Sequence, residues 1–466
     1  MTTSETHAAE AAEPVNSRML TLDRLRHLIE DGEVDTVIMA FTDMQGRLSG
    51  KLLHARYFLD VALAGGVEGC NYLLAVDVDM NTVDGYAISS WERGYGDMEW
   101  VPDWSTLRRL THLPATAMVQ CDLTWPDHTP VAESPRGILK AQLDRAAEMG
   151  FSVHAGTELE FIAFEDTYEE AHRLDYTGLT PVNQYNIDYS LLGSTRVEPL
   201  VRDIRNHMYA AGMDVESAKG ECNLGQHEIG FLFNTALITC DNHVVYKTAA
   251  KQIAAAHGKS LSFMAKYDQR EGNSCHIHLS LRALDGGLVF WDKDKDQRTP
   301  LYDSFVAGLL DSMTDFTLLY APNVNSYKRF ADASFAPTAI AWGMDNRTCA
   351  VRLVGSGGSA RLENRVPGGD VNPYLAVAAM LAGGLDGIER KLKPVPATEG
   401  NAYESGLPTV PRTLHAARDA FASSKVARSV FGDAVVDHYT NMADVELASF
   451  DASVTDWERR RGFERL

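Results

Sequence analysis

The sequence predicts an α+β fold in which an antiparallel sheet carries helices on one side. Strand and helix patterns alternate after about residue 130, and their order is too irregular for repeated β-α-β units. Several of the strands also carry charged side chains on one face. With 466 residues, of which 45% are hydrophobic and 23% charged, the chain is long enough for at least two domains.

We expect three regions along the chain. Residues 1–17 are rich in Ala, Glu and Thr and lack a basic start or an apolar core, which predicts a disordered tail and not a signal peptide. An N-terminal domain is expected over 18–130 and a larger domain over 131–466.

The N-terminal domain begins with an amphipathic helix and a strand hairpin. Residues 20–29 have helical periodicity, and 43–47 have the composition of a turn between two strands. The expected strands of this domain are 36–41, 48–53, 98–101 and 117–123.

A proline cluster marks the start of the larger domain. Pro135 suits the first position of a helix over 135–149, and Ser134 is placed to cap it. The other expected helices are 198–211, 241–257, 302–320 and 373–391. The expected strands are 152–164, 213–219, 260–267, 275–282, 337–342, 348–354 and 360–366.

Composition excludes several classes of function. The formal charge of −21 argues against nucleic-acid binding. The chain has no run of about 18 apolar residues, so we expect no membrane span. The six cysteines are scattered without a CxxC pair, which indicates free thiols in a reducing compartment. We therefore expect a cytoplasmic enzyme that binds neither nucleic acid nor membrane.

Two strand segments concentrate metal-type side chains. Glu158 and Glu160 share one strand face, where two carboxylates repel each other and gain from a cation. His276 and His278 also share a face, and one could bind metal while the other donates to phosphate. The alternatives are an exposed polar strand face and structural histidines.

Glu221 and Glu228 are a weaker pair. At seven residues apart they lie on opposite faces of a regular strand, and they converge only if the chain turns between them. Asn223, Gly225 and Gln226 permit such a turn. Two unrelated surface acids are an equally good interpretation.

Arginines are dense near the C-terminal third of this acidic chain. Arg361, Glu363 and Arg365 form a row on one strand face, while Arg329, Arg347 and Arg352 precede it. Each fits either a surface ion pair or a contact to phosphate or carboxylate. Carboxylates with one His and several Arg suit divalent cations that hold a nucleotide's phosphates, so we expect a phosphate-handling enzyme.

Six segments, taken together and in order, identify a resemblance. From about residue 20 onward the chain resembles glutamine synthetases, in segments 156–161, 273–280, 325–329, 346–352, 361–365 and 372–388. The resemblance implies an N-terminal β-grasp domain and a catalytic α+β domain. It also implies a homo-oligomer, expected to be a dodecamer of two stacked hexameric rings with active sites shared between neighbours.

The resemblance implies a role for each metal-type and nucleotide residue. Two or more Mg²⁺ or Mn²⁺ ions are expected with ATP as substrate. One ion is implied at Glu160, Glu221 and Glu228, and another at Glu158, His276 and Glu363. The implied nucleotide and phosphate contacts are His278, Ser280, Arg347, Arg352 and Arg361.

The resemblance also places glutamate. Arg329 is similar to the residue that holds its α-carboxylate, Arg365 to one near its γ-carboxylate, and Gly272 to the loop that accepts its amino group. Arg329, Arg347 and Arg361 are the arginines with an implied catalytic role. The implied reaction is phosphorylation of the glutamate side chain by ATP, followed by attack of an amine on the acyl phosphate.

Two positions depart from the family pattern near the amine, and a third matches it only with a gap. Phe335 stands where the family flap has a Glu two residues before a Pro, and a phenyl ring cannot accept a proton. Asp84 matches an ammonium-site Asp only when a gap is placed, and Glu271 replaces the usual Asn before the glutamate loop.

We therefore expect a γ-glutamyl ligase that acts on glutamate and an organic amine. A polyamine such as putrescine, cadaverine, spermidine or spermine is the first expectation, with Phe335 and Glu271 near it. Ethanolamine or another monoamine and ammonia are the alternatives. A catalytically silent scaffold is the non-enzyme alternative.

Overall fold

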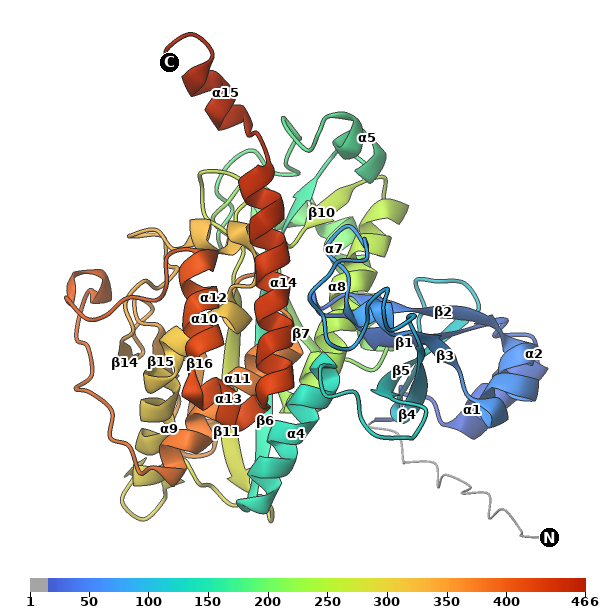
Figure 1. Ribbon diagram of the computed structural model, residues 1–466, viewed down its shortest axis with the longest axis horizontal. Coiled ribbons are helices and arrows are strands. Elements are labelled where there is room, and N and C mark those ends of the chain that lie inside the picture. The colour runs from blue at the N-terminus through green and yellow to red at the C-terminus, as the bar shows by residue number, and fades with distance from the viewer. Residues whose placement is uncertain (1–15) are drawn as a thin grey trace.

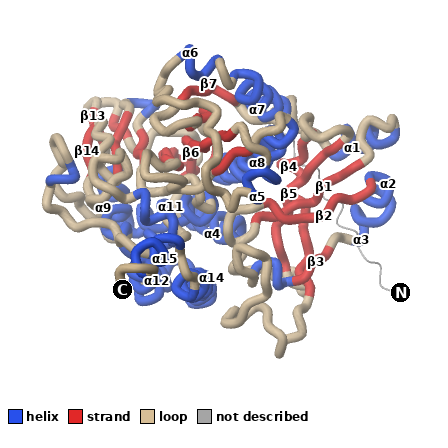
Figure 2. The backbone as a smooth tube through the Cα atoms, turned by 90° about the horizontal axis from the view of Figure 1, so that it is seen from above, coloured by secondary structure: helices blue, strands red, loops and turns tan. Residues whose placement is uncertain are grey.

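The computed structural model describes residues 16–466, so most of the expected N-terminal tail lies outside the described residues. The chain forms a five-stranded sheet near the N-terminus and a nine-stranded sheet in the remainder, each accompanied by helices (Figures 1 and 2). This arrangement confirms the α+β class. None of the helices in the described part combines the length and hydrophobicity that a membrane span requires.

The smaller sheet follows helix α1 (Leu22–Glu30), whose first turn is capped by the Thr21 side chain. Its strand order is β2-β1-β5-β4-β3, and only the β1–β5 pair is parallel. The strands are β1 (Thr36–Thr42), β2 (Leu48–His54), β3 (Glu68–Cys70), β4 (Asp97–Arg109) and β5 (Thr116–Thr124). Short helical turns over 55–65, which the composition did not predict, connect β2 to β3.

The larger sheet has the order β14-β15-β16-β11-β6-β8-β7, with β9 and β10 also pairing with β6. All pairs are antiparallel except β14–β15. The strands are β6 (Phe151–Phe164), β7 (Val215–Gly220), β8 (Gln226–Phe231), β9 (Asn234–Thr235), β10 (Ser260–Ser262), β11 (Cys275–Ala283), β14 (Trp342–Met344), β15 (Val351–Val354) and β16 (Arg361–Asn364). A separate two-stranded sheet joins β12 (Trp291–Asp292) to β13 (Gln297–Arg298).

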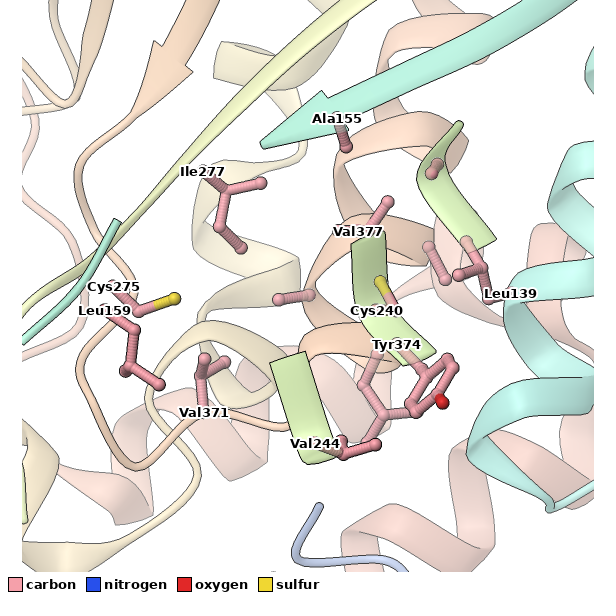
Figure 3. Packing of buried hydrophobic residues seen from close by; sticks show 14 of the residues in the cluster. Leu139, Ala155, Leu159, Cys240, Val244, Cys275, Ile277, Val371, Tyr374 and Val377 are labelled. Carbon is pink, nitrogen blue, oxygen red and sulfur yellow. The ribbon is translucent and has the colours of Figure 1, made fainter. Parts of the chain in front are cut away.

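Helices cover one face of the larger sheet. Side chains of β6 and β11, such as Leu159 and Ile277, pack toward Val244 of α8 and Val377 of α11 (Figure 3). The helices of this layer are α4 (Pro135–Glu148), α8 (Ala236–Ala256) and α11 (Pro373–Glu389), and α9 (Pro300–Asp311) and α10 (Met313–Tyr320) pack against α11. Because strand side chains alternate, the acids and histidines of these strands face the other side.

Further helices surround this core. They are α5 (Tyr168–Arg173), α6 (Leu191–Thr195), α7 (Glu198–Ala210), α12 (Leu414–Ser423), α13 (Lys425–Phe431), α14 (Asp433–Ala452) and α15 (Asp456–Gly462). The helix α14 runs along the core, and α15 projects beyond it at the C-terminal end (Figure 1).

Several predicted elements differ from the structure. The helix expected over 302–320 is two helices, α9 and α10, which break at Ser312, where the hydroxyl donates to the carbonyl of Gly308. The strand expected over 260–267 ends at Ser262, because the Asn273 side chain takes up the carbonyls of Ser262 and Met264.

Two further predictions require correction. The segment 337–342 is not a strand of the large sheet, because its backbone bonds to residues 408–410 instead, and β14 begins only at Trp342. The neighbouring strand, expected over 348–354, begins at Val351. Ser134 does stand before α4, but its side chain makes no capping hydrogen bond.

Buried polar contacts join the two sheets. Arg136 of α4 bonds to Asp241 of α8, to Asp103 of β4 and to Asp122 of β5. Its guanidinium is therefore shared between both parts of the chain, which fixes the N-terminal sheet against the helices behind the larger sheet.

Candidate active site

The face of the larger sheet opposite the helices is charged. In the strand register, His276 lies opposite Glu158, His278 opposite Glu363, and Glu228 opposite Glu160. Directly opposed residues project to the same face, so these side chains form one continuous row. The row extends to Lys219 on one side and Arg352 on the other.

Glu160, Glu221 and Glu228 form the first cluster of acids. Each offers a carboxylate oxygen within 4.8 Å of the others. Glu221 follows β7, and the chain reverses through Gly225, whose φ is +68° and whose absent Cβ would lie 2.5 Å from the Ala163 carbonyl oxygen. The turn that the spacing of these two acids required is therefore present, and a glycine makes it possible.

Glu158, His276 and Glu363 form the second cluster, also with ligand atoms within 4.8 Å. The Nδ1 atom of His276 lies 3.4 Å from Glu158 Oε2 and 3.5 Å from Glu363 Oε1. Burial, and then the charge of Arg365, lowers the pKa of His276. This favours the neutral imidazole, which is the form that ligates metal.

The carboxylates of the second cluster are held ionised. Burial opposes ionisation of Glu158, but hydrogen bonds from His276 and His278 outweigh it, so the pKa of Glu158 lies well below its ordinary value. Burial likewise opposes ionisation of Glu363, but the electrostatic influence of His276 and then of Arg365 outweighs burial and brings the pKa of Glu363 down. Both acids thus carry the charge that a metal ligand needs.

Two arginines hold Glu363, which is fully buried. Its Oε2 accepts from Arg352 at 2.9 Å and its Oε1 from Arg365 at 2.5 Å. Arg352 also donates to Asp345. Paired in this way, the buried carboxylate has a fixed orientation, and its arginines already lie beside the cluster.

The first cluster carries more negative charge than the protein neutralises. Burial raises the pKa of Glu228 to about 8; Lys219 opposes this shift, while Glu158 and Glu160 add to it. The Lys219 ammonium pairs with Glu221 and lies 3.8 Å from Glu228 Oε2. Three converging carboxylates, one of which has a raised pKa, fit a divalent cation, and their oxygen atoms suit Mg²⁺ or Mn²⁺.

Residues that sequence reasoning missed position these acids. The amide of Gln226 donates to Glu160 Oε2 at 3.0 Å and to the carbonyl of Gly272, and the backbone of Ser274 donates to the same Glu160 oxygen. Gln226 and Lys219 each precede a cluster acid by two residues. In an extended chain, residues two apart share a face, so this spacing could have identified both residues from the sequence.

The predicted glutamate residues lie next to the first cluster. Arg329 is buried and donates to the carbonyls of Val366 and Arg365 at 2.8 and 2.9 Å, which leaves its Nε without a partner among the described residues. A Cβ on Gly272 would lie 2.9 Å from Arg329 Cγ, so a glycine allows this close approach. Gly272 lines the cavity described next, whereas Arg329 lies next to Gly272 and does not line this cavity.

A cavity of about 290 Å³ opens over the two clusters. Arg347, Arg365 and Gly272 line it, together with Glu271 and Phe335. Phe335 is 59% exposed and adopts a φ of +57°, a strained conformation for an aromatic residue.

Three cavity residues had not been singled out from the sequence. Asp188 and Tyr189 lie in the loop before α6, and Cys222 donates from its thiol to Asp188 Oδ2 at 3.6 Å. Tyr189 also has a positive φ, of +53°, and its ring lies 5.2 Å from the Lys219 ammonium. No local pattern of residues indicates that this loop returns to the sheet.

Other predicted residues lie at the edge of the cavity or away from it. His278 bonds to Glu158 at 2.9 Å and accepts from Arg361 Nε at 3.2 Å, but neither lines the cavity. Ser280 lies two residues further along the same strand face. Asp84 is exposed in a loop that bonds to Asn441 of α14, so the chain by itself does not bring it to this site.

Comparisons with known proteins place the chain in a family. Residues 132–462 match the model of the glutamine synthetase catalytic domain. A γ-glutamylethanolamide synthetase of Streptomyces coelicolor is 58% identical, with 96% of each chain covered. A glutamate–isopropylamine ligase of a Pseudomonas species is 36% identical, covering 94% of this chain and 97% of the relative.

Solved structures agree with the sequence relatives. A structure described as a GmaS/ADP complex has a TM-score of 0.82 at 28% identity, covering 94% of this chain and 99% of the other. The chain therefore belongs to the glutamine synthetase family, whose members use ATP and divalent metals, and it is a ligase. The family resemblance predicted from the sequence is confirmed.

Proposed function

We propose that the chain joins the γ-carboxyl group of glutamate to a small organic amine at the expense of ATP, with ethanolamine as the best-supported amine. The observation that carries this proposal is the cavity over two acid clusters, with Phe335, Tyr189 and Asp188 at its edge. Both relatives at 58% and 36% identity are named for short monoamines. Their names favour the ethanolamine alternative over the polyamine expectation.

Two consecutive steps account for the reaction. A γ-carboxylate oxygen of glutamate attacks the terminal phosphorus of ATP, and the bond to the bridging oxygen breaks to release ADP. The amine nitrogen then attacks the acyl carbon, loses a proton, and phosphate leaves. We assign Arg329 and Gly272 to glutamate, and Arg347, Arg352 and Arg361 to the phosphates.

The two clusters would hold divalent ions, one at Glu160, Glu221 and Glu228 and the other at Glu158, His276 and Glu363. When bound, such ions neutralise phosphate oxygens and align the transferred group. The chain's own contribution is to fix the ligands, through Gln226 on Glu160 and Arg365 on Glu363.

The edge of the cavity suits an amine that carries carbon. Phe335 offers an apolar ring, and its face can attract a cation by about 0.5–2 kcal/mol. Asp188 and Glu271 add carboxylates beside it. Both ammonium and an organic ammonium ion can use the ring face and the acids, but only the organic ion has carbon atoms to bury against the ring.

The proposal is tested by assaying the purified protein with ATP, Mg²⁺, glutamate and a panel of amines, with mass spectrometry of the products. We expect kcat/KM to be highest for ethanolamine, followed by isopropylamine. Higher values for putrescine or spermidine would restore the polyamine interpretation, and a higher value for ammonia would make the protein an ordinary glutamine synthetase.

A single substitution tests the amine contact. Asp188→Asn should raise the KM for ethanolamine about tenfold, because a charge-assisted hydrogen bond is lost. The KM for glutamate and for ATP should not change. Glu169→Gln, which removes an exposed acid from α5, is the matched control. An unchanged KM for ethanolamine in Asp188→Asn would remove Asp188 from the site.

A further inference from the structure

The segment 330–337, which we call the flap, carries two residues that line the cavity over the acid clusters, Ser334 and Phe335. The flap contains neither a helix nor a strand. Ala333 and Phe335 both have a φ of +57°, a conformation that residues with a side chain seldom adopt. Such a segment keeps one shape only when contacts from the surrounding structure hold it.

Two side chains from a later part of the chain hold the flap. The Tyr403 hydroxyl donates to the carbonyl of Ala336 at 3.0 Å, and the Arg412 guanidinium donates to the carbonyl of Phe330 at 2.7 Å. These bonds lie at the two ends of the flap, and the bond from Tyr403 is at the residue directly after Phe335. Tyr403 is therefore well placed to set the position of the Phe335 ring.

Tyr403 is itself anchored to the body of the protein. It lies in the short 3₁₀-helix η5 (Ala402–Glu404), where the Asn401 side chain accepts from the Tyr403 backbone at 3.1 Å. The backbone of Ala402 donates to the Thr348 hydroxyl at 2.9 Å, and its side chain is fully buried in a small apolar cluster. The Tyr403 hydroxyl thus offers the flap a fixed point of attachment.

Arg365 also reaches the flap, but less closely. Its guanidinium donates to Glu363 at 2.5 Å, and its Nη2 atom lies 3.5 Å from the Phe335 carbonyl oxygen. The second contact is at the upper limit for a hydrogen bond and is weak. On this side of the flap, the bond from Tyr403 to Ala336 is the stronger attachment.

We propose that Tyr403 is a positioning residue for the amine, and this inference rests on the proposed function. Its hydroxyl holds the flap so that the Phe335 ring stays at the end of the cavity where the amine binds. Tyr403 is not one of the residues that line the cavity, so it acts through Phe335 and not on the substrate. Without this bond the flap loosens, and the ring no longer packs against the carbon atoms of the amine.

A loose flap also exposes the acyl phosphate to water. The water oxygen attacks the γ-acyl carbon and loses a proton, and the bond between that carbon and the phosphate oxygen breaks. Glutamate and phosphate form, so the net reaction is hydrolysis of ATP to ADP and phosphate without an amide product. Closed segments over active sites commonly exclude water from reactive intermediates in this way.

Tyr403→Phe tests the proposal because it removes only the hydroxyl. We expect the KM for ethanolamine to rise about fivefold, which corresponds to about 1 kcal/mol for one hydrogen bond. The amount of ATP hydrolysed per amide formed should rise as well, whereas the KM for ATP should not change. Tyr57→Phe, at an exposed position of α2 (Ala55–Tyr57), is the matched control and should leave all three quantities unchanged.

Two measurements separate positioning from a general loss of structure. Hydrogen exchange of 330–337, followed by mass spectrometry without substrates, should be faster in Tyr403→Phe, while exchange in the core strands β6 and β11 stays the same. In a Phe335→Ala background, Tyr403→Phe should raise the KM for ethanolamine by less than about twofold, because the ring that Tyr403 positions is absent.

Three results would overturn the proposal. One is an unchanged KM for ethanolamine with unchanged coupling of ATP to amide in Tyr403→Phe. Another is an equal effect of this substitution with and without the Phe335 ring, and the third is faster exchange throughout the chain. If the wild-type protein forms no amide from ethanolamine, the proposed function is wrong; exchange of the flap, which needs no substrate, then still decides whether Tyr403 holds it.

Discussion

At the scale of single residues, the site depends on buried charges that hold one another in place. Glu363 has no exposed surface and bonds to Arg352 and Arg365 while it faces His276. Removal of its charge would leave the buried guanidinium of Arg365 and the half-buried one of Arg352 with one partner fewer. This is why one carboxylate can matter both to an ion at the second cluster and to the arginines beside it.

Glu363→Gln should lower kcat/KM for amide synthesis at least about a hundredfold, because an amide binds divalent ions more weakly than a carboxylate does and also loosens both arginines. Steady-state assays over a range of Mg²⁺ concentrations measure this effect. Glu389→Gln, which alters an acid exposed on α11, is the control. Rates like those of the wild type would remove Glu363 from the metal assignment.

The choice of amine is also argued at this scale. Phe335→Glu places an acid where the flap has a phenyl ring, and we expect it to shift the ratio of kcat/KM for ethanolamine over ammonia about tenfold toward ammonia. Phe335→Leu keeps an apolar side chain and should retain the preference for ethanolamine. An unchanged ratio in Phe335→Glu would show that Phe335 does not contact the amine.

At the scale of elements, the helix α11 connects the N-terminal sheet to the core. Asn372 caps this helix by accepting from the Tyr374 backbone at 3.2 Å, and its amide donates to the carbonyls of Asp43 and Met44 at 3.2 and 3.0 Å. Gly46, in the same β1–β2 turn, has a φ of +80°, and a Cβ there would lie 3.0 Å from Asn372 Cα. The residue that caps α11 thus also holds the β1–β2 turn of the N-terminal sheet in place.

Asn372→Ala should lower the free energy of unfolding by about 2–3 kcal/mol, because one cap and two buried hydrogen bonds are lost. Urea denaturation measures the change. Asn401→Ala, which removes a similar cap from a short exposed turn, should cost about 1 kcal/mol or less. Equal effects in the two variants would mean that the bonds to the β1–β2 turn contribute nothing.

At the scale of the whole molecule, a buried histidine on α14 links this helix to the N-terminal third of the chain. His438 of α14 lies 2.9 Å from the sulfur of Met44 and 4.7 Å from the centre of the Tyr86 ring. Burial lowers the pKa of His438 to about 3. The folded chain therefore keeps this imidazole neutral.

This shift makes stability depend on pH. Between about pH 6.5 and pH 3 the unfolded chain binds a proton at His438 that the folded chain does not, so this residue makes stability fall as the pH decreases, by about 2 kcal/mol between pH 7 and pH 5. Urea midpoints at the two pH values measure the loss. His438→Leu should reduce the loss by about this amount, and the buried His227 and His243, whose pKa values burial also lowers, should maintain the rest. His128→Gln, at an exposed position, should not change it.

The assembly belongs to the same scale. The helix α15 projects from the body, and Trp457, Phe463 and Leu466 at this end are largely exposed. Asp84 is likewise exposed, and it does not line the chain's own site. We predict a homo-oligomer, a dodecamer by the family resemblance, and expect a chain that ends at Ser453 to form a smaller assembly in light scattering. An unchanged mass would exclude α15 from subunit contacts.

The sequence by itself determined the class of fold, the family and the strand faces that carry Glu158, Glu160, His276 and Glu363. The strand faces follow from a side-chain period of two, which is a local property of a strand. The family follows from the resemblance carried by six ordered segments. Most long helices and strands were also predicted, because their apolar periodicity is local. The domain boundary at 130 and the roles of the individual residues are still predictions.

Only the tertiary structure decided which segments meet. The strand register sets His276 against Glu158 and Glu228 against Glu160, and it returns Gln226 and Lys219 to the same acids. The loop with Asp188 and Tyr189, and the hydrogen bond from Tyr403 to the flap, depend on contacts between residues far apart in the chain. Long-range pairing is a matter of packing and burial over the whole molecule, and no local pattern of residues encodes it.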